Sequence, residues 1–135
     1  MTNTNRPIRR ALVSVFHKEG IEVLAEAFVK AGTEVVSTGS TAKKLAELGV
    51  KVTEVSDVTG FPECLDGRVK TLHPYIHAGI LADMTNPDAR QDSSRSSVIK
   101  PFDLVVVNLY PFADTVRSGA NEADTIEKID IGGPS

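Results

Sequence analysis

The sequence predicts an α/β fold in which helices cover both faces of a central, mostly parallel β-sheet. Strand-like and helix-like segments alternate over residues 11–55, in the order strand, helix, strand, helix, strand. Such an alternation with short connections produces parallel strands joined by right-handed crossovers. An uninterrupted apolar run at residues 104–109 is typical of a strand buried on both faces. Together these observations predict three layers within one domain, a size that 135 residues suit.

The first predicted strand covers residues 11–16, which form a short apolar run. A helix follows, because apolar residues recur at spacings of three and four and Gly32 can terminate it. The apolar stripe of this helix consists of Ile21, Leu24, Ala25 and Phe28. Residues 34–37 are short and rich in β-branched side chains, so they predict the second strand.

Residues 38–40 are expected to turn the chain into a second helix, which Gly49 terminates. Its apolar stripe consists of Ala42, Leu45, Ala46 and Leu48. Residues 50–55 alternate in polarity and predict a third strand near a sheet edge. Residues 76–81 suit either a short strand or a helix.

The remaining segments are less regular. Residues 1–8 predict a flexible arm ahead of a domain that covers residues 9–135. Residues 86–97 are rich in Asp, Ser and Arg and predict an exposed loop. A last helix is expected over residues 122–128, with Asn121 as its cap, before a glycine-rich end without regular structure.

The composition excludes several classes of protein and site. A formal net charge of −3, without a basic tail, argues against general nucleic-acid binding. The single cysteine, Cys64, excludes an internal disulfide and a cysteine-based metal cluster, and it fits a reducing, cytoplasmic compartment. The polar start does not resemble a signal peptide, and no apolar run approaches the roughly 20 residues that span a bilayer.

A candidate phosphate site lies where the second predicted strand meets the second predicted helix. It consists of Ser37, Thr38, Gly39, Ser40 and Thr41. Ligands of open α/β sheets bind at the carboxyl ends of strands, and a helix amino terminus offers backbone N–H groups to an anion. Glycine allows a close approach, and the hydroxyl groups add donors. The alternative is that these Ser and Thr residues only cap the helix.

A cationic segment at residues 66–74 places Arg68, Lys70 and His73 close together and ends at Pro74. Arg68 offers a planar fork of donors to an oxygen anion, whereas Lys70 offers a compact point charge. Histidine is the side chain that titrates near neutral pH. The pattern favours an anionic, planar small molecule. The alternatives are a surface ion pair for Arg68 and a capping role for His73.

A metal site is not expected. His73 and His77 have the spacing of two ligands on one helical face. However, Pro74 lies between them and no third ligand is evident. The sequence therefore predicts no metal site.

Further polar side chains lie at and after the end of the apolar run at residues 104–109. Asn108 can donate and accept, and Tyr110 can donate to an oxyanion at the carboxyl end of that strand. The alternative is that Tyr110 and Phe112 pack beneath the loop. Asp130 precedes a glycine pair and can accept a proton or orient an amide. Its alternative role is that of a turn-forming aspartate.

Four segments, in order along the chain, resemble one family. They are Gly-Phe-Pro at 60–62, the cationic segment 66–74, VVVNLYPF at 105–112 and IDIGGPS at 129–135. All four are similar to the amino-terminal cyclohydrolase domain of AICAR transformylase/IMP cyclohydrolase, a bifunctional enzyme of purine biosynthesis. The resemblance covers residues 9–135 and implies a methylglyoxal-synthase-like fold.

The resemblance implies the last step of inosinate synthesis. The carboxamide nitrogen of the formamido-imidazole-carboxamide ribonucleotide (FAICAR) attacks the formyl carbon, and loss of water gives IMP. No metal or redox cofactor is needed for this ring closure. The resemblance further implies a cytoplasmic homodimer whose partner molecule is this purine ribonucleotide, with no nucleic acid and no membrane.

The resemblance also implies roles for individual residues. Lys70, Tyr110 and Asp130 would lie at the reacting atoms, with Lys70 closest to the chemistry. The implied nucleotide-binding residues come from five segments. They are Phe16, His17 and Lys18; Thr38, Gly39, Ser40 and Thr41; Arg68, Val69 and Thr71; Val107 and Asn108; and Ile131 and Gly132.

The chain departs from the family pattern at two places near the implied site. Phe16 and His17 stand where the family commonly has Ser and Asp. The sequence ends at Ser135, before a helix that carries a further lysine in the family, so low activity is expected. Two other functions remain open: methylglyoxal synthase, against which the specific runs at 66–74 and 105–112 argue, and a non-catalytic nucleotide-binding regulatory module.

Overall fold

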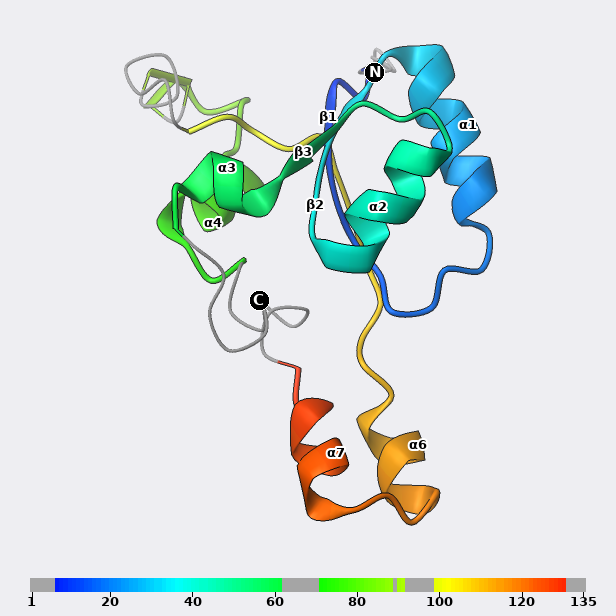
Figure 1. Ribbon diagram of the computed structural model, residues 1–135. Helices are drawn as coiled ribbons and strands as arrows, with labels where there is room; N and C mark the ends of the chain where they lie inside the picture. Colours follow the sequence, from blue (N-terminus) through cyan, green and yellow to red (C-terminus); the bar gives the residue numbers. More distant parts are fainter. Residues whose placement is uncertain (1–6, 62–70, 89, 92–98, 131–135) are drawn as a thin grey trace, which may run out of the picture.

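The fold has a sheet between two layers of helices. Figure 1 shows the chain as a computed structural model that describes residues 7–61, 71–88, 90–91 and 99–130. The strands are β1 (Arg10–Ser14), β2 (Glu34–Ser37), β3 (Val52–Glu54) and β4 (Leu104–Val107). The helices are α1 (Ile21–Ala31), α2 (Gly39–Glu47), α3 (Val55–Thr59), α4 (Pro74–Leu81), α6 (Phe112–Arg117) and α7 (Glu122–Glu127).

The four strands form one parallel sheet in the order β3-β2-β1-β4. Ala11 of β1 pairs with Val35 of β2 on one side and with Leu104 of β4 on the other. The predicted parallel sheet is therefore confirmed, and so is the prediction that the third strand lies at a sheet edge. Since all strands run the same way, their carboxyl ends lie along one edge of the sheet.

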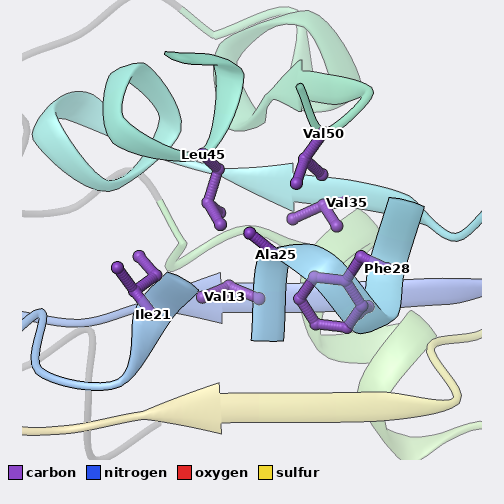
Figure 2. Close-up of a cluster of buried hydrophobic side chains, with 8 residues drawn as sticks. Val13, Ile21, Ala25, Phe28, Val35, Leu45 and Val50 are labelled. Carbon is purple, nitrogen blue, oxygen red and sulfur yellow. The ribbon is translucent and has the colours of Figure 1, made fainter. Parts of the chain in front are cut away.

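The two faces of the sheet bury separate apolar clusters, because successive side chains of a strand point to opposite faces. On one face, side chains of β1 and β2 pack against α1 and α2, as Figure 2 shows for Val13, Ile21, Phe28, Val35 and Leu45. On the other face, Leu12 and Val36 pack against α3 and α4. The predicted three-layer α/β fold is thus confirmed.

The predicted boundaries around the second helix are wrong in detail. Gly39 and Ser40, expected in a turn, are the first two residues of α2. The strand expected over residues 50–55 is reduced to β3: Val50 joins the core ahead of it, and Val55 begins α3. Alternating valines suit a buried loop and a helix start as well as a strand, so their pattern did not separate these states.

The run at residues 104–109 was predicted as a strand buried on both faces, and this is wrong. β4 covers only Leu104–Val107 and is an edge strand of the described sheet. Leu104 and Val106 pack against the core, whereas Val105 and Val107 are 41% and 38% exposed. A continuous apolar run does not reveal whether both faces of its strand are covered.

The second half of the chain is more helical than predicted. The segment at 76–81 belongs to helix α4, and α6 was not predicted. Residues 87, 88, 90 and 91, placed in an exposed loop, are exposed but helical. The last helix is confirmed as α7, and Asn121 caps it by accepting the Asp124 N–H at 2.8 Å.

Ile8, the last residue of the predicted arm, is bonded to the domain. Its carbonyl accepts a 2.6 Å hydrogen bond from Thr33 Oγ1.

Hydrogen bonds of Asp103 and Arg10 connect the amino ends of β1 and β4. Asp103 Oδ2 accepts the N–H groups of Arg9 at 2.9 Å and Arg10 at 3.0 Å. The buried Arg10 guanidinium donates to the Lys100 carbonyl at 2.5 Å and lies over the Phe102 ring. Burial lowers the pKa of Arg10, which Glu34 partly opposes. These contacts fix β4 against β1 and so set where its carboxyl end lies.

Candidate functional site

The parallel sheet brings three predicted binding segments to one edge. The segments 16–18, 38–41 and 108–110 follow β1, β2 and β4, which are neighbours in the sheet. They are far apart in the sequence but leave the same edge, where ligands of open α/β sheets bind. The candidate site is therefore the carboxyl edge of β2, β1 and β4.

The amino terminus of α2 presents backbone donors at this edge. Thr38 is the N-cap residue, but its side chain makes no capping hydrogen bond. Within the described part of the chain, no group accepts the N–H of Gly39, Ser40 or Thr41. Gly39 has a φ of 50°, in the left-handed region that favours glycine. The Thr38 side chain therefore does not cap α2. The N–H groups of the exposed Gly39 and Ser40, at the positive end of the helix dipole, suit an anion.

Two hydroxyl groups of this segment serve the fold. Ser37 is fully buried, and its Oγ donates to the Val13 carbonyl at 2.6 Å. The sequence prediction that Ser37 donates to a phosphate is therefore wrong. Thr41 Oγ1 donates to the Val15 carbonyl at 2.9 Å and accepts the Val15 N–H at 3.4 Å. Thr41, which is buried, thus ties the loop after β1 to α2.

Asn108 joins the loops after β4 and β1. Its Oδ1 accepts the N–H groups of Phe16 at 2.6 Å and His17 at 3.1 Å, while its Nδ2 donates to the His17 carbonyl at 2.8 Å. The predicted base-contacting amide is thus largely occupied in shaping the segment 16–18. Val107, the residue before it, is partly exposed at the end of β4.

The hydrogen bonds of Asn108 form a clamp between the loops after β1 and β4. Aromatic and charged side chains lie beside this clamp. The rings of Phe16 and Tyr110 meet edge to face with centroids 5.6 Å apart, and each residue is 37% exposed. The Lys128 ammonium lies 5.1 Å from the Phe16 centroid and 5.8 Å from that of Tyr110. Asp130 Oδ2 accepts the Tyr110 N–H at 3.2 Å. Sequence reasoning missed Lys128, since nothing in its local pattern connects it with Phe16.

In the segment 16–18, which follows β1, the side chains of Lys18 and His17 contact other parts of the same segment. Lys18 Nζ donates to the carbonyls of Val15 at 3.0 Å and Phe16 at 3.3 Å, and burial lowers its pKa. The His17 ring meets the Phe16 ring at 86°. Lys18 therefore fixes the turn that carries Phe16 and His17.

Five predicted site residues lie outside the described residues: Arg68, Val69, Lys70, Ile131 and Gly132. Thr71, the first described residue after residue 70, is partly buried, and its carbonyl accepts the His73 N–H at 2.9 Å.

His73 caps α4, as one of the two sequence interpretations proposed. Its Nδ1 accepts the Tyr75 N–H at 3.1 Å, and Pro74 takes the first helical position. His77 Nε2 is buried without a hydrogen-bond partner among the described residues. In the same described set, no group of three or more His, Cys, Asp or Glu side chains could hold a metal ion. Capping accounts for the His73 side chain.

Replacing His73 by alanine is expected to lower the free energy of unfolding by about 1 kcal/mol, because the Tyr75 N–H loses its acceptor. Replacement by asparagine supplies another capping oxygen and should recover most of the loss. Urea denaturation of the three proteins measures the difference. An equal loss in both variants would contradict the capping role.

None of the helices in the described part of the chain combines the length and apolar character needed to cross a bilayer.

Comparison with known proteins adds a family and several relatives. The model of the MGS-like domain family matches residues 20–135. The chain is 65% identical over 130 residues to the bifunctional purine biosynthesis protein PurH of Cutibacterium acnes, covering 96% of this chain and 25% of that protein. It is 58% identical to the PurH proteins of Corynebacterium glutamicum (strain R), over 100% of this chain and 26% of the relative, and Mycobacterium ulcerans, over 96% and 25%. It thus spans about a quarter of the length of these relatives.

A solved structure, the crystal structure of ForH, is similar in fold. It matches with a TM-score of 0.74 and 32% sequence identity, over 93% of this chain and 64% of that chain. The parallel sheet, the match over residues 20–135 and the identity to the three PurH proteins agree with one another. The chain belongs to the family of MGS-like domains.

Proposed function

We propose that this chain binds a purine ribonucleotide and takes part in purine biosynthesis as an IMP cyclohydrolase domain that closes FAICAR to IMP. The observation that carries the proposal is the convergence, at one sheet edge, of the α2 amino terminus with Asn108 and Tyr110. An anion site beside an aromatic and amide surface suits a phosphate joined to a planar base. The names of the relatives, which refer to purine biosynthesis, support it.

In this proposal the two ends of the nucleotide bind to different elements. The phosphate accepts the N–H groups of Gly39, Ser40 and Thr41 at the start of α2. The base lies toward Val107 and Asn108, at the end of β4. Phe16 and Tyr110 supply an exposed aromatic edge beside it. The family resemblance adds the remaining binding residues, which are His17, Lys18, Thr38, Arg68, Val69, Thr71, Ile131 and Gly132.

Ring closure requires stabilisation of an oxygen anion, a base for the attacking nitrogen and an acid for the departing water. The carboxamide nitrogen loses one proton and forms a bond to the formyl carbon, and the formyl oxygen becomes an alkoxide. That oxygen then gains two protons and leaves as water, while the formamido nitrogen loses its proton and forms the C=N bond of the new ring. Lys70 and the Tyr110 hydroxyl are proposed to stabilise the developing oxygen anion, since donors aimed at such charge lower the barrier. Asp130 is proposed to take the proton of the attacking nitrogen. The hydrogen bond of Asp130 to the backbone N–H of Tyr110 supports a shared role for these two residues.

The proposal includes the partner classes expected from the sequence. The ligand is a purine ribonucleotide, the chain forms a homodimer in the cytoplasm, and no metal or redox cofactor takes part. Neither nucleic acid nor a membrane is a partner.

Calorimetry with IMP, inosine and a triose phosphate tests the binding proposal. IMP is expected to bind, inosine to bind at least tenfold more weakly because it lacks the phosphate, and the triose phosphate not to compete. No IMP binding at millimolar concentration would refute the nucleotide site. Tight competition by the triose phosphate would favour a methylglyoxal synthase.

A ring-closure assay with FAICAR then tests the enzymatic part. Turnover above the uncatalysed rate supports the cyclohydrolase. IMP binding without turnover, in this chain and in the full-length Cutibacterium acnes relative, would favour a regulatory nucleotide-binding module.

A further inference from the structure

Lys128 directly follows α7 and lies partly buried against two aromatic rings. Its ammonium is 5.1 Å from the centroid of Phe16 and 5.8 Å from that of Tyr110. Within the described residues, no carboxylate lies within ion-pair distance of this ammonium. The cation therefore takes its position from the rings, since a cation within about 6 Å of a ring centroid is attracted by the ring.

The two rings that Lys128 contacts come from loops that follow different strands. Phe16 lies in the loop after β1 and Tyr110 in the loop after β4, and they meet at an angle of 76°. Asp130, two residues after Lys128, accepts the Tyr110 N–H. The segment after α7 thus holds Tyr110 twice, at its backbone through Asp130 and at its ring through Lys128.

These contacts matter because α6 and α7, the helices that follow Tyr110 in the chain, contain no buried residues. Neither helix belongs to the two core clusters. The Tyr110 ring is partly exposed, so its packing leaves part of its surface to solvent. A long lysine stem that lies along apolar rings while its charge stays near water is a common way to order such a surface.

We propose that Lys128 is a positioning residue that orders the Tyr110 ring against Phe16 and thereby prepares the site for the nucleotide. This inference rests on the proposed function for the role of Tyr110, whereas the ordering of the ring is independent of it. Lys128 acts through Tyr110 and makes no step of the reaction itself. No sequence motif in the chain assigns this role to Lys128.

The spectroscopic test uses the aromatic content of the chain. There is no tryptophan and there are two tyrosines, so Tyr75→Phe leaves Tyr110 as the sole tyrosine. In that background, the near-ultraviolet circular dichroism band of tyrosine reports the order of the Tyr110 ring. Lys128→Met keeps the apolar stem and removes the charge, so the band should lose intensity. Lys128→Arg keeps a cation that stacks on aromatic rings and should restore it.

A matched control separates this effect from a general loss of charge. Lys30 is an exposed residue of α1 paired with Glu26, and Lys30→Met changes the net charge by the same amount. This control should leave both the tyrosine band and IMP binding unchanged. Lys128→Met should weaken IMP binding by about two- to fivefold, the size expected for loss of one exposed cation–π contact.

Three results would decide against the inference or limit it. An unchanged tyrosine band in Lys128→Met would overturn it, whatever happens to IMP binding. A changed band with unaltered IMP affinity would show that ordering Tyr110 does not prepare the site, and would also overturn it. If the parent protein binds no IMP, the proposed function fails, and the tyrosine band alone then decides whether Lys128 orders Tyr110.

Discussion

Replacing Asn108 by alanine is expected to lower IMP affinity by tenfold or more and the free energy of unfolding by about 2–3 kcal/mol. The side chain makes three hydrogen bonds to the backbone of Phe16 and His17. Each is worth about 1 kcal/mol to stability. Without them the segment after β1 loses its connection to β4, and Phe16 is no longer held against Tyr110. Calorimetry with IMP and urea denaturation measure the two effects.

Asn86 provides a matched control, because among the described residues its Oδ1 accepts one local N–H, that of Asp88, at 2.9 Å. Asn86→Ala should cost about 1 kcal/mol or less and leave IMP affinity unchanged. If Asn108→Ala were as mild as Asn86→Ala in both measurements, the clamp between β1 and β4 would not organise the site. A loss of stability without any loss of affinity would limit Asn108 to a structural role.

The elements that the sequence predicted correctly are those with strong local signals. The second strand was predicted with its observed bounds, because two valines and two polar residues form a short segment between a helix terminator and a glycine. Helix α1 follows from its apolar spacing and ends at Gly32, which adopts a φ of 66°. Such signals depend on neighbouring residues only, so they are readable without the fold.

The incorrect predictions concern what lies opposite a residue in space. The hydroxyl of Ser37 resembles a phosphate donor in sequence, but its partner is Val13, which pairs with it across the sheet. The exposure of Val105 depends on whether another element covers the outer face of β4. Lys128 contacts Phe16 across more than a hundred residues of chain. Only the arrangement of the elements brings such pairs together.

The candidate site was predictable in part, for the same reason. The parallel sheet brings the segments after β1, β2 and β4 to one edge, as the alternation of elements predicted. The roles of individual side chains within these segments were less predictable. Thr41 and Lys18 bond to backbone carbonyls of the loop after β1, which their residue types alone do not indicate.

Replacing Gly39 by alanine is expected to lower IMP affinity more than tenfold while leaving the much weaker binding of inosine unchanged. Gly39 has a φ of 50°, and an alanine there costs about 1–2 kcal/mol unless the backbone turns. Turning the backbone redirects the N–H groups of Gly39, Ser40 and Thr41, which are the proposed phosphate donors. Calorimetry with IMP and inosine on each variant measures the ratio of the two affinities.

Gly49 is a matched control at the other end of α2. It also has a positive φ, of 87°, and the methyl group of an alanine at this position would have no neighbouring atom within 4 Å. Gly49→Ala therefore introduces similar backbone strain, but it leaves the first turn of α2 in place. It should lower stability without changing the IMP-to-inosine ratio. If both variants changed this ratio equally, general strain in α2 would explain the loss. A fall confined to Gly39→Ala would assign the phosphate to the backbone of the first turn, because both variants keep every hydroxyl group of that turn.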